Sequence, residues 1–557
     1  MRRFLKIFSL SLIALFFLLL SITMGLYYSA LHKFKEPNVS VDLSDYPLTQ
    51  WSDSLRICGN NYLLLNTDGL WEAKISGSAL ERGAILGLMS KDILQNQERV
   101  FVDQIHQIIP SERYIRILHK FIAIFNRNMV QHIPAEYLEE IYAMSLSCGK
   151  EYDDYGTPYA RQLNYHAAHD IGHTMQVYML VGCSSFAAWE KETDDGELIV
   201  GRNFDFYVGD GFAKNKIVLF VNPDSGYKYA SITWPGMTGV VSGMNECGLA
   251  VTINAAKGAV PTSTAMPISL LVRHILMHAR NIEEAMAIAE KCQTFVSESI
   301  LVASACDKRA AIIEKTPKET YLYSTDSTHI ICTNHYQSDY FSDNKYNAEN
   351  IAMSDSKYRF DRLAELIADS VPLNVQKSVD ILRNRYGLHN EDIGLTNEKS
   401  INQFIAHHSV VFEPEKLKMW VSTSPWQCGA FLCYDLNDVF AANDNIDSFA
   451  VTERERIPAD TIFLQCDLDR VESFRWQTAE FRQAIDKHIL LPHDFVNIYI
   501  DSNPNYYLVY DLAGDYQLSQ NNIEAAKDYW NEALTKEIPH LSIRKSIEKK
   551  LKRHDKK

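Results

Sequence analysis

The pattern of hydrophobic and polar positions changes twice along the chain. From residue 80 to 148, in stretches such as "YIRILHKFIAIFNRNMV", apolar residues recur at helical spacing, which predicts helices. From residue 183 to about 445, short β-branched and aromatic runs alternate with glycine, asparagine, aspartate and proline, which predicts strands. Helical spacing then returns. The chain therefore combines a helical segment, a strand-rich domain and a helical C-terminal part.

The strand-rich domain contains two pairs of amphipathic helical stretches between its strands. The first pair is "PISLLVRHILMHA" and "NIEEAMAIAEKC", and the second is "SKYRFDRLAELIADS" and "VQKSVDILRN". Strands in runs and helices in pairs predict an α+β domain in which two sheets are flanked by helices.

The N-terminal segment has three basic residues within its first six positions, followed by an almost uncharged apolar run over residues 7–28. A run of this length is sufficient to cross a bilayer as a helix. We therefore expect a signal anchor at residues 1–33, with a cleaved signal peptide as the alternative. The body would then be membrane-anchored on the periplasmic or extracellular side, or secreted if the signal is removed.

Charge and cysteine spacing argue against two properties, nucleic-acid binding and a disulfide framework. The 557-residue chain carries a formal net charge of -15. Nucleic-acid binding needs a basic surface that neutralises phosphates, so we expect no nucleic-acid partner. The ten cysteines are irregularly spaced without a CxxC pair, so no disulfide framework is expected.

The stretch "VGCSSF" places Cys183 between Gly182 and two serines, directly before a predicted strand. If the peptide bond between Gly182 and Cys183 were cut, Cys183 would carry a free α-amino group. The pKa of such a group is about 7.7 to 8.0, so it would serve as general base for the thiol of the same residue. Glycine favours a cut here because it adopts strained backbone angles and leaves its carbonyl open to attack.

The predicted strands supply further groups for this chemistry. In "GRNFDF", Arg202 is a cation that would lower the pKa of the thiol, and Asp205 is a carboxylate that would orient the α-amino group. Asn254 and Asn334 end two predicted strands, and their amides are candidate donors to an oxyanion. Without Cys183, the same residues would indicate only a strand-end ion pair and turn-forming asparagines.

Six motifs in register make the chain resemble a known family over residues 68 to 440. They are "GCSSF", "GRNFDF", "MNECGLAVTINAA", "IIEKTP", "ICTNHY" and "SKYRFDRL". In this order they resemble the acyl-CoA:6-aminopenicillanate acyltransferase-like (peptidase C45) family of N-terminal nucleophile (Ntn) hydrolases. Choloylglycine hydrolases and acid ceramidases are similar at a greater distance.

The resemblance implies an αββα sandwich that processes itself between Gly182 and Cys183, with the processed chains remaining associated. It also implies a small-molecule N-acyl amide substrate, an acyl-thioester intermediate and no cofactor. Cys183 matches the nucleophile, Asp205 the residue beside the α-amine, and Asn254 and Asn334 the oxyanion-side asparagines. Arg202 matches the arginine of bile-salt hydrolases and ceramidases, where the penicillin-forming acyltransferase has glutamine. We therefore favour amide hydrolysis over acyl-CoA-dependent N-acyl transfer.

A further arginine, Arg359 or Arg362 in "KYRFDRL", is a candidate to complete the site. On a helix, however, Arg359 is also spaced to pair with Asp355, and Arg362 with Glu365.

Two alternatives belong to other functional classes. The stretch "HAAHDIGH" contains His166, His169, Asp170 and His173, which share a helix face and form a candidate zinc site. It lacks the glutamate of an HExxH motif, and helix packing also explains it. The second alternative is a membrane-anchored interaction protein that uses its C-terminal helices without catalysis.

The predicted organisation has five segments. Residues 1–33 form the signal anchor or signal peptide, 34–67 a linker, 68–182 a mostly helical pro-segment, 183–445 the Ntn-hydrolase domain and 446–557 a C-terminal helical extension.

Overall fold

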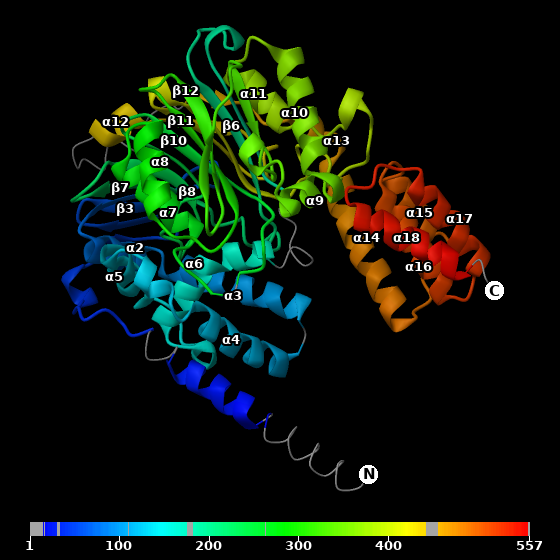
Figure 1. Ribbon diagram of the computed structural model, residues 1–557, viewed down its shortest axis with the longest axis horizontal. Helices are drawn as coiled ribbons and strands as arrows, with labels where there is room; N and C mark the ends of the chain where they lie inside the picture. Colours follow the sequence, from blue (N-terminus) through cyan, green and yellow to red (C-terminus); the bar gives the residue numbers. More distant parts are fainter. Residues whose placement is uncertain are drawn as a thin grey trace.

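Two β-sheets and their flanking helices form the body of the protein in the computed structural model (Figure 1). The structure describes residues 15, 17–29, 34–109, 111–174, 182–261, 263–441 and 455–554. The mixed α+β class predicted from the sequence is confirmed.

The larger sheet has eleven strands. In spatial order they are β1 (Gln50–Trp51), β2 (Leu55–Cys58), β3 (Asn61–Leu65), β4 (Trp71–Gly77), β7 (Ile217–Pro223), β8 (Tyr229–Thr233), β9 (Ser242–Asn245), β10 (Leu249–Ala255), β11 (Glu298–Ser304), β12 (Arg309–Lys315) and β13 (Thr320–Tyr323). All neighbours are antiparallel except β4 and β7, which run parallel.

The second sheet has seven strands, all paired antiparallel. In spatial order they are β14 (His329–Cys332), β5 (Ser184–Ala188), β6 (Ile199–Asp205), β15 (Ala406–Glu413), β16 (Lys418–Ser422), β17 (Phe431–Asp435) and β18 (Arg456–Ile457).

Helices cover the outer faces of both sheets. Those of the body are α2 (Ala79–Met89), α3 (Lys91–Ile108), α4 (Glu112–Asn126), α5 (Ala135–Ser145), α6 (Pro158–Thr174), α7 (Ile268–His278), α8 (Ile282–Lys291), α9 (Lys345–Met353), α10 (Ser356–Ser370), α11 (Val375–Leu382) and α12 (Leu436–Ala441). Figure 1 shows α7 and α8 over the larger sheet, and α10 and α11 beside the second.

Alternating side chains on the strands create separate hydrophobic cores. On β7, Val218 and Phe220 face the second sheet and pack with Val410, whereas Leu219 and Val221 pack against the helices on the other side. A strand buried on both faces needs a nearly continuous apolar run, and "IVLFV" provides one. A further core lies between the second sheet and α10 and α11. The order of these cores is helices, sheet, sheet, helices.

The helices before Cys183 belong to this body as well. Helix α2 begins at a capping box formed by Ser78 and Glu81, and it packs closely on α5. A Cβ atom at Gly83 would lie only 2.2 Å from the carbonyl oxygen of Glu140, so glycine is what permits this approach.

Two predicted boundaries are wrong. The expected linker at 34–67 contains β1 to β3, and the expected pro-segment at 68–182 begins with β4, which lies inside the larger sheet. The strand β18 extends the second sheet past the predicted domain end at residue 445. The sequence did not predict the short strands β1 to β3 and β18, because they acquire hydrogen-bonding partners only through pairing between distant segments.

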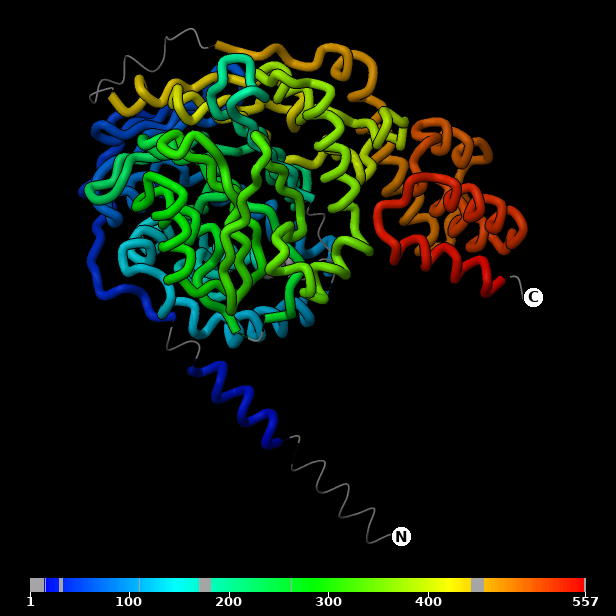
Figure 2. The backbone as a smooth tube through the Cα atoms, turned by 45° about the horizontal axis from the view of Figure 1, so that its top comes forward, coloured from blue at the N-terminus to red at the C-terminus, as the bar shows by residue number. Residues whose placement is uncertain are grey.

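The C-terminal extension is helical, as predicted. It contains α13 (Thr461–Cys466), α14 (Leu468–Lys487), α15 (Phe495–Ser502), α16 (Tyr507–Ser519), α17 (Ile523–Leu534) and α18 (Leu541–His554). Its helices have their own core around Phe481, Tyr499 and Trp530. Figure 2 shows this orange-to-red bundle at one side of the body.

The predicted membrane helix receives no support. Within the described part of the chain, no helix has both the length and the apolar character that a membrane span needs. Residues 17–29 are helical, but 1–14, 16 and 30–33, on which much of the signal-anchor prediction falls, lie outside the described residues.

Candidate active site

Cys183 lies immediately before β5, at one end of the hairpin formed with β6. In this hairpin Ser185 pairs with Arg202 and Ser184 with Asn203. Cys183 therefore lies next to the C-terminal end of β6. Its side chain is buried. The backbone N–H of Gly182 donates to the carbonyl oxygen of Asp205 at 3.1 Å, which fixes the chain just before the cysteine.

The guanidinium of Arg202 lies beside the thiol of Cys183. Its Nη2 atom is 3.5 Å from the sulfur and also donates to the carbonyl oxygen of Ile253 at 2.6 Å. Its Nη1 atom donates to the carbonyl oxygen of Val241 at 2.8 Å and to the hydroxyl of Ser242. These bonds to β9, β10 and the segment preceding β9 hold the cation in place between the two sheets.

Burial and charge act in opposite directions on the thiol. Burial raises the pKa of Cys183, the nearby Arg202 cation lowers it, and the Asp205 carboxylate raises it again, leaving it above its ordinary value. The uncut chain therefore holds the sulfur mainly as a thiol.

Asp205, at the end of β6, is a fully buried carboxylate. Among the described residues neither of its carboxylate oxygens has a hydrogen-bond partner. Burial raises the pKa of Asp205 to about 7, although the positive charges of Arg359 and Arg202 oppose this shift. A buried carboxylate without a donor is costly, which makes this group a candidate for binding a cation.

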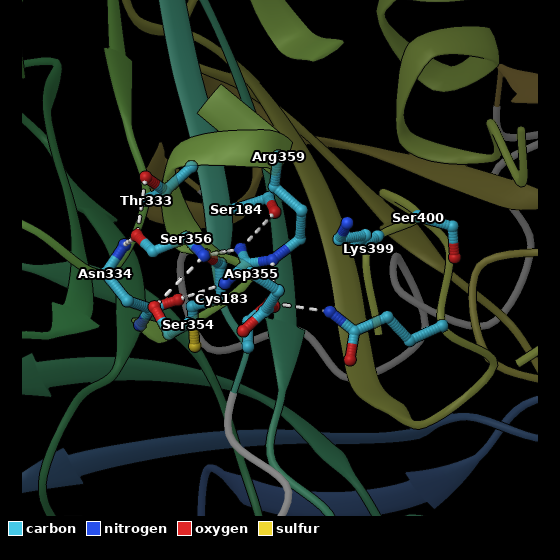
Figure 3. Close-up of polar contacts among 12 residues, drawn as sticks. Cys183, Ser184, Thr333, Asn334, Ser354, Asp355, Ser356, Arg359, Lys399 and Ser400 are labelled. Atoms are coloured by element: carbon cyan, nitrogen blue, oxygen red, sulfur yellow. Dashed lines mark hydrogen bonds and ion pairs between the residues drawn. The ribbon is translucent and has the colours of Figure 1, made fainter. Parts of the chain in front are cut away.

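Arg359 on α10 reaches the main chain of the nucleophile (Figure 3). Its Nη1 atom donates to the carbonyl oxygen of Cys183 at 2.7 Å and to the hydroxyl of Ser184 at 2.9 Å. Its Nη2 atom donates to Oδ1 of Asn334 at 2.6 Å, and its Nε atom to Asp355 at 2.7 Å. The pairing with Asp355 that the sequence allowed is present, but in the buried site and not at the surface.

The two predicted asparagines are both held by the surrounding strands. Asn254 donates to the carbonyl oxygen of Cys332 at 2.9 Å and accepts from the hydroxyl of Ser185 at 3.1 Å. The amide nitrogen of Asn334 donates to the carbonyl oxygen of Ala255 at 2.9 Å. The structure therefore brings together Cys183, Arg202, Asp205, Asn254, Asn334 and Arg359.

Arg362 does not join this group. Its Nη1 atom contacts Glu365 at 2.5 Å, and its Nη2 atom donates to Asn390 at 2.5 Å. The alternative pairing with Glu365 is thus the observed one, and Arg362 is excluded from the candidate site.

The predicted zinc ligands serve packing where the structure describes them. His166 accepts from the backbone N–H of Thr238 at 3.0 Å through Nε2, and its Nδ1 atom lies 2.8 Å from the carbonyl oxygen of Gln162. Burial lowers the pKa of His166 to about 4, so the ring is neutral. Asp170 accepts from the backbone N–H of Ile268 at the start of α7. The side chains of His169 and His173 lie outside the described residues.

Both ring nitrogens of His166 are therefore occupied, which removes it as a metal ligand. Across the parts of the chain that the structure describes, no cluster of three or more His, Cys, Asp or Glu residues is arranged to hold a metal ion.

Gln403 is a site residue that the sequence did not reveal. Its Nε2 atom donates to the carbonyl oxygen of Gly182 at 3.3 Å, which belongs to the peptide bond predicted to be cut. A Cβ atom at position 182 would lie 2.5 Å from that same nitrogen, so a larger residue here would displace the amide of Gln403. Gln403 lies in "INQFIAHH", more than 200 residues after Gly182, and no motif in the sequence connects the two.

Comparison with protein families identifies the domain that contains these residues. Residues 190–424 match the family model of acyl-coenzyme A:6-aminopenicillanic acid acyl-transferase. The predicted family resemblance is confirmed. This acyl-transferase family segment includes every candidate residue brought together above except Cys183, which precedes it by seven positions. The matched family is described as an acyl-transferase, which agrees with the predicted class of enzyme.

Individual relatives are distant. An uncharacterized protein of Archaeoglobus fulgidus is 22% identical over 403 residues, which cover 64% of this chain and 65% of that protein. The chain thus spans slightly less than two thirds of the length of this relative.

Among solved structures, part of the chain is similar to three hydrolases. The N-acylethanolamine-hydrolyzing acid amidase ortholog of Caenorhabditis elegans is 16% identical, with a TM-score of 0.32, and covers 42% of this chain and 93% of its own. The R18L variant of conjugated bile acid hydrolase from Clostridium perfringens is 13% identical, with a TM-score of 0.33 over 49% and 96%. Penicillin V acylase from Agrobacterium tumefaciens is 15% identical, with a TM-score of 0.30 over 47% and 93%.

Proposed function

We propose that the protein is a self-processing cysteine amidohydrolase of the Ntn class, in which Cys183 becomes the first residue of the active chain. The observation that carries this proposal is the pair Cys183 and Asp205, a buried thiol close to a buried carboxylate that has no hydrogen-bond partner among the described residues. In the uncut chain the nitrogen of Cys183 is an amide. Once cut, it would be an ammonium or amine group, which is the kind of donor that Asp205 lacks.

The processing step is an attack by the Cys183 sulfur on the carbonyl carbon of Gly182. As the carbon–nitrogen bond breaks, the thiol proton passes to the nitrogen of Cys183, and Gly182 becomes linked to the sulfur as a thioester. Water then hydrolyses the thioester, which frees the thiol and leaves Gly182 as a carboxylate. Gln403 supports this step because its Nε2–H already points at the oxygen on which negative charge would develop.

Turnover of an external substrate would use the same groups. The free α-amine of Cys183 would accept the thiol proton, the sulfur would attack the acyl carbon of an N-acyl amide, and the protonated α-amine would return a proton to the leaving amine. Asn254 and Asn334 would donate to the oxyanion, since each amide nitrogen has two N–H groups and donates only one hydrogen bond within the described residues. Water would then release the acyl group from the thioester.

The two chains produced by processing would remain associated. Strand β4, on the N-terminal side of the cut, pairs in parallel with β7 over seven residue pairs. Parallel central strands do not separate without exposing both sheet edges, so the fragments would leave each other only on unfolding.

Acyl transfer to an amine is a second candidate, and the family match favours it because that family is described as an acyl-transferase. The two outcomes differ only in what attacks the thioester. Adding hydroxylamine during turnover separates them: a hydrolase yields mainly the free acid, whereas a transferase yields mainly the hydroxamate at the same rate of substrate loss.

Intact-mass measurement of purified protein tests the proposal directly. We expect two chains that meet between Gly182 and Cys183, and a single uncut chain for Cys183→Ala. A correctly folded, active preparation in which the Gly182–Cys183 bond is intact would contradict self-processing, and amide turnover by Cys183→Ala would contradict the nucleophile.

A further inference from the structure

A large cleft lies between the body and the C-terminal extension. Its volume is about 940 Å³, near the upper end of the range for small-molecule sites. One wall comes from the body, including Asn350, Ser354 and Gln403. The opposite wall comes from α14, α16 and α18 of the extension, including Phe474, Arg482, Leu508 and Ile543. The matched family segment ends at residue 424, so this second wall lies outside it.

The cleft adjoins the reaction centre. Gln403 lines the cleft and also donates to the carbonyl oxygen of Gly182 at 3.3 Å. Asn350 lines it and donates to the carbonyl oxygen of Asn334 at 2.5 Å. In Figure 3, Ser354 lies beside Asn334 and Cys183. Residues that line the cleft therefore contact the groups that we propose cleave amides.

The extension is fixed firmly enough to shape this cleft. The side chain of Asn503 exchanges two hydrogen bonds with the backbone of Leu395, at 2.9 and 2.8 Å. The hydroxyl of Tyr506 donates to Glu398 at 3.0 Å. His540 lies 3.8 Å from Asp355, the carboxylate that holds Arg359. The extension thus binds both the loop that carries Gln403 and the network around Cys183.

The lining combines an apolar surface with three cationic side chains that differ in their partners. Lys257 pairs with Glu349 at 3.3 Å, and Arg475 pairs with Asp210 at 3.0 Å. For Arg482, by contrast, the described residues supply neither an ion pair nor a hydrogen bond.

The carboxylate of Glu398, on the body side of the cleft, does not fully neutralise Arg482, although the charge of Arg482 acts to lower the pKa of Glu398. Glu398 accepts from Tyr506 and forms no ion pair with Arg482 within the described residues. Burial raises the pKa of Glu398 to about 7, so near neutral pH this group is protonated about half of the time. Arg482 therefore leaves a net positive charge on the cleft wall.

We infer that the C-terminal extension forms one wall of the substrate site, which takes an amphipathic amide bearing a carboxylate that pairs with Arg482. The apolar part of such a molecule would lie along Phe474, Leu508 and Ile543, where burial of hydrocarbon is favourable. The guanidinium would bind the carboxylate through two parallel hydrogen bonds, a geometry that an ammonium does not offer. The substrate class rests on the proposed function, but the binding site itself does not.

Calorimetric titration of the full-length protein with two uncleavable probes tests this inference. N-dodecylsulfonyl-glycine carries an apolar chain and a carboxylate, and its carboxamide twin lacks only the charge. A sulfonamide offers no acyl carbon to a thiol, so binding is measured whether or not Cys183 is a nucleophile. We expect the carboxylate to bind about 10-fold more tightly than the carboxamide, as one charge-assisted contact predicts.

Variants on one helix provide the controls. Arg482→Gln should abolish the preference for the carboxylate and leave carboxamide binding within about 2-fold, and Arg482→Lys should retain part of the preference. Arg470→Gln, also on α14 but paired with Asp467 and outside the cleft lining, should behave as wild type.

Three results would overturn the inference: neither probe binds, both probes bind wild type equally, or the preference survives in Arg482→Gln. A failure of the proposed function would appear elsewhere, as amide turnover by Cys183→Ala.

Discussion

Glu140 in the helical layer and Asp205 at the end of β6 are both buried carboxylates, yet their surroundings differ completely. Glu140 accepts from Arg273 at 2.6 Å and from Arg82 at 2.7 Å. Burial alone would raise the pKa of Glu140, but the two arginines outweigh it and lower that pKa. Asp205 has no such donor among the described residues, and burial raises its pKa to about 7.

The difference does not come from a lack of arginines near Asp205. Arg202 and Arg359 both lie close enough to act on its pKa. Their N–H groups, however, are committed to main-chain carbonyls and to the side chains of Cys183, Ser184, Ser242, Asn334 and Asp355. The exception is the Nε atom of Arg202, which has no partner among the described residues. A paired buried carboxylate stabilises a fold, whereas an unpaired one costs stability and marks a functional site. The comparison therefore supports a structural role for Glu140 and the catalytic role proposed above for Asp205.

Removal of the Cys183 thiol gives the largest expected effect. Cys183→Ala should abolish chain cutting and reduce amide turnover about 10⁴-fold or more, because no other nucleophile replaces the sulfur. Intact mass and a fluorogenic N-acyl amide assay measure the two effects. Cys58→Ala, which removes a buried thiol in β2, is the matched control and should process normally. Normal processing of Cys183→Ala would contradict the proposal that the Cys183 sulfur cuts the chain.

Exchange of the two carboxylates for amides sharpens the comparison. Asp205→Asn should lower kcat/KM about 10² to 10³-fold. In the uncut Cys183→Ala background it should leave the free energy of unfolding unchanged or higher, since there it removes a buried charge without a partner among the described residues. Glu140→Gln should lower the free energy of unfolding by about 3 to 5 kcal/mol, since it leaves Arg82 and Arg273 without their anion. Urea denaturation and steady-state kinetics on both variants give the readout. The same stability loss in both variants would show that the two sites do not differ.

Loss of the donor to the Gly182 carbonyl should affect cutting more than turnover. Gln403→Ala should slow processing about 10²-fold, as loss of one oxyanion donor does. We expect kcat for amide hydrolysis by the processed protein to change by less than about 3-fold, because the carbonyl of Gly182 is no longer on the reaction path. A time course of fragment formation after cell-free synthesis measures the first effect. Gln427→Ala, another buried glutamine, is the control, and equal delays in both variants would contradict the assignment.

The pH dependence of stability should differ in sign between the two carboxylates. Asp205 has a folded pKa of about 7 against an ordinary value of 3.8, so the folded chain holds its proton longer than the unfolded chain does. Its contribution to the free energy of unfolding therefore falls as the pH rises from about 4 to about 7, by at most about 1.4 kcal/mol per unit. Glu140, whose pKa is lowered, loses stability only as the pH falls below its ordinary value of 4.5.

Urea midpoints of the uncut Cys183→Ala protein, with and without Asp205→Asn, between about pH 5 and about pH 8 isolate this contribution. The difference between the two proteins should grow with pH over this interval. A constant difference would mean that Asp205 is already ionised throughout it and has a partner in solution.

Local patterns predicted the parts of the fold and site that depend on neighbours in the sequence. Helical spacing over 80–148 and β-branched runs after residue 183 both correspond to the observed elements. The hairpin of β5 and β6 places Arg202 near Cys183 because only about twenty residues separate the two.

The errors lie where distant segments meet. Residues 50–65 were expected to be a linker, yet they form strands because they extend a sheet completed by segments more than 100 residues away. Arg359 and Arg362 could not be told apart because, three positions apart, they lie about 60° apart around one helix. Only the packing of α10 on the second sheet directs Arg359 to Cys183 and Arg362 to Asn390.

The sequence by itself determined which segments become helices and strands, and it placed a candidate nucleophile before a strand with a cation and a carboxylate on the next one. These properties follow from side-chain periodicity and short-range pairing. Only the tertiary structure decided that Asp205 has no donor among the described residues, that Gln403 reaches Gly182 and that the C-terminal helices line the same cleft as Gln403. Each of these depends on which distant groups compete for the same hydrogen bonds, and that competition is settled only when the layers pack.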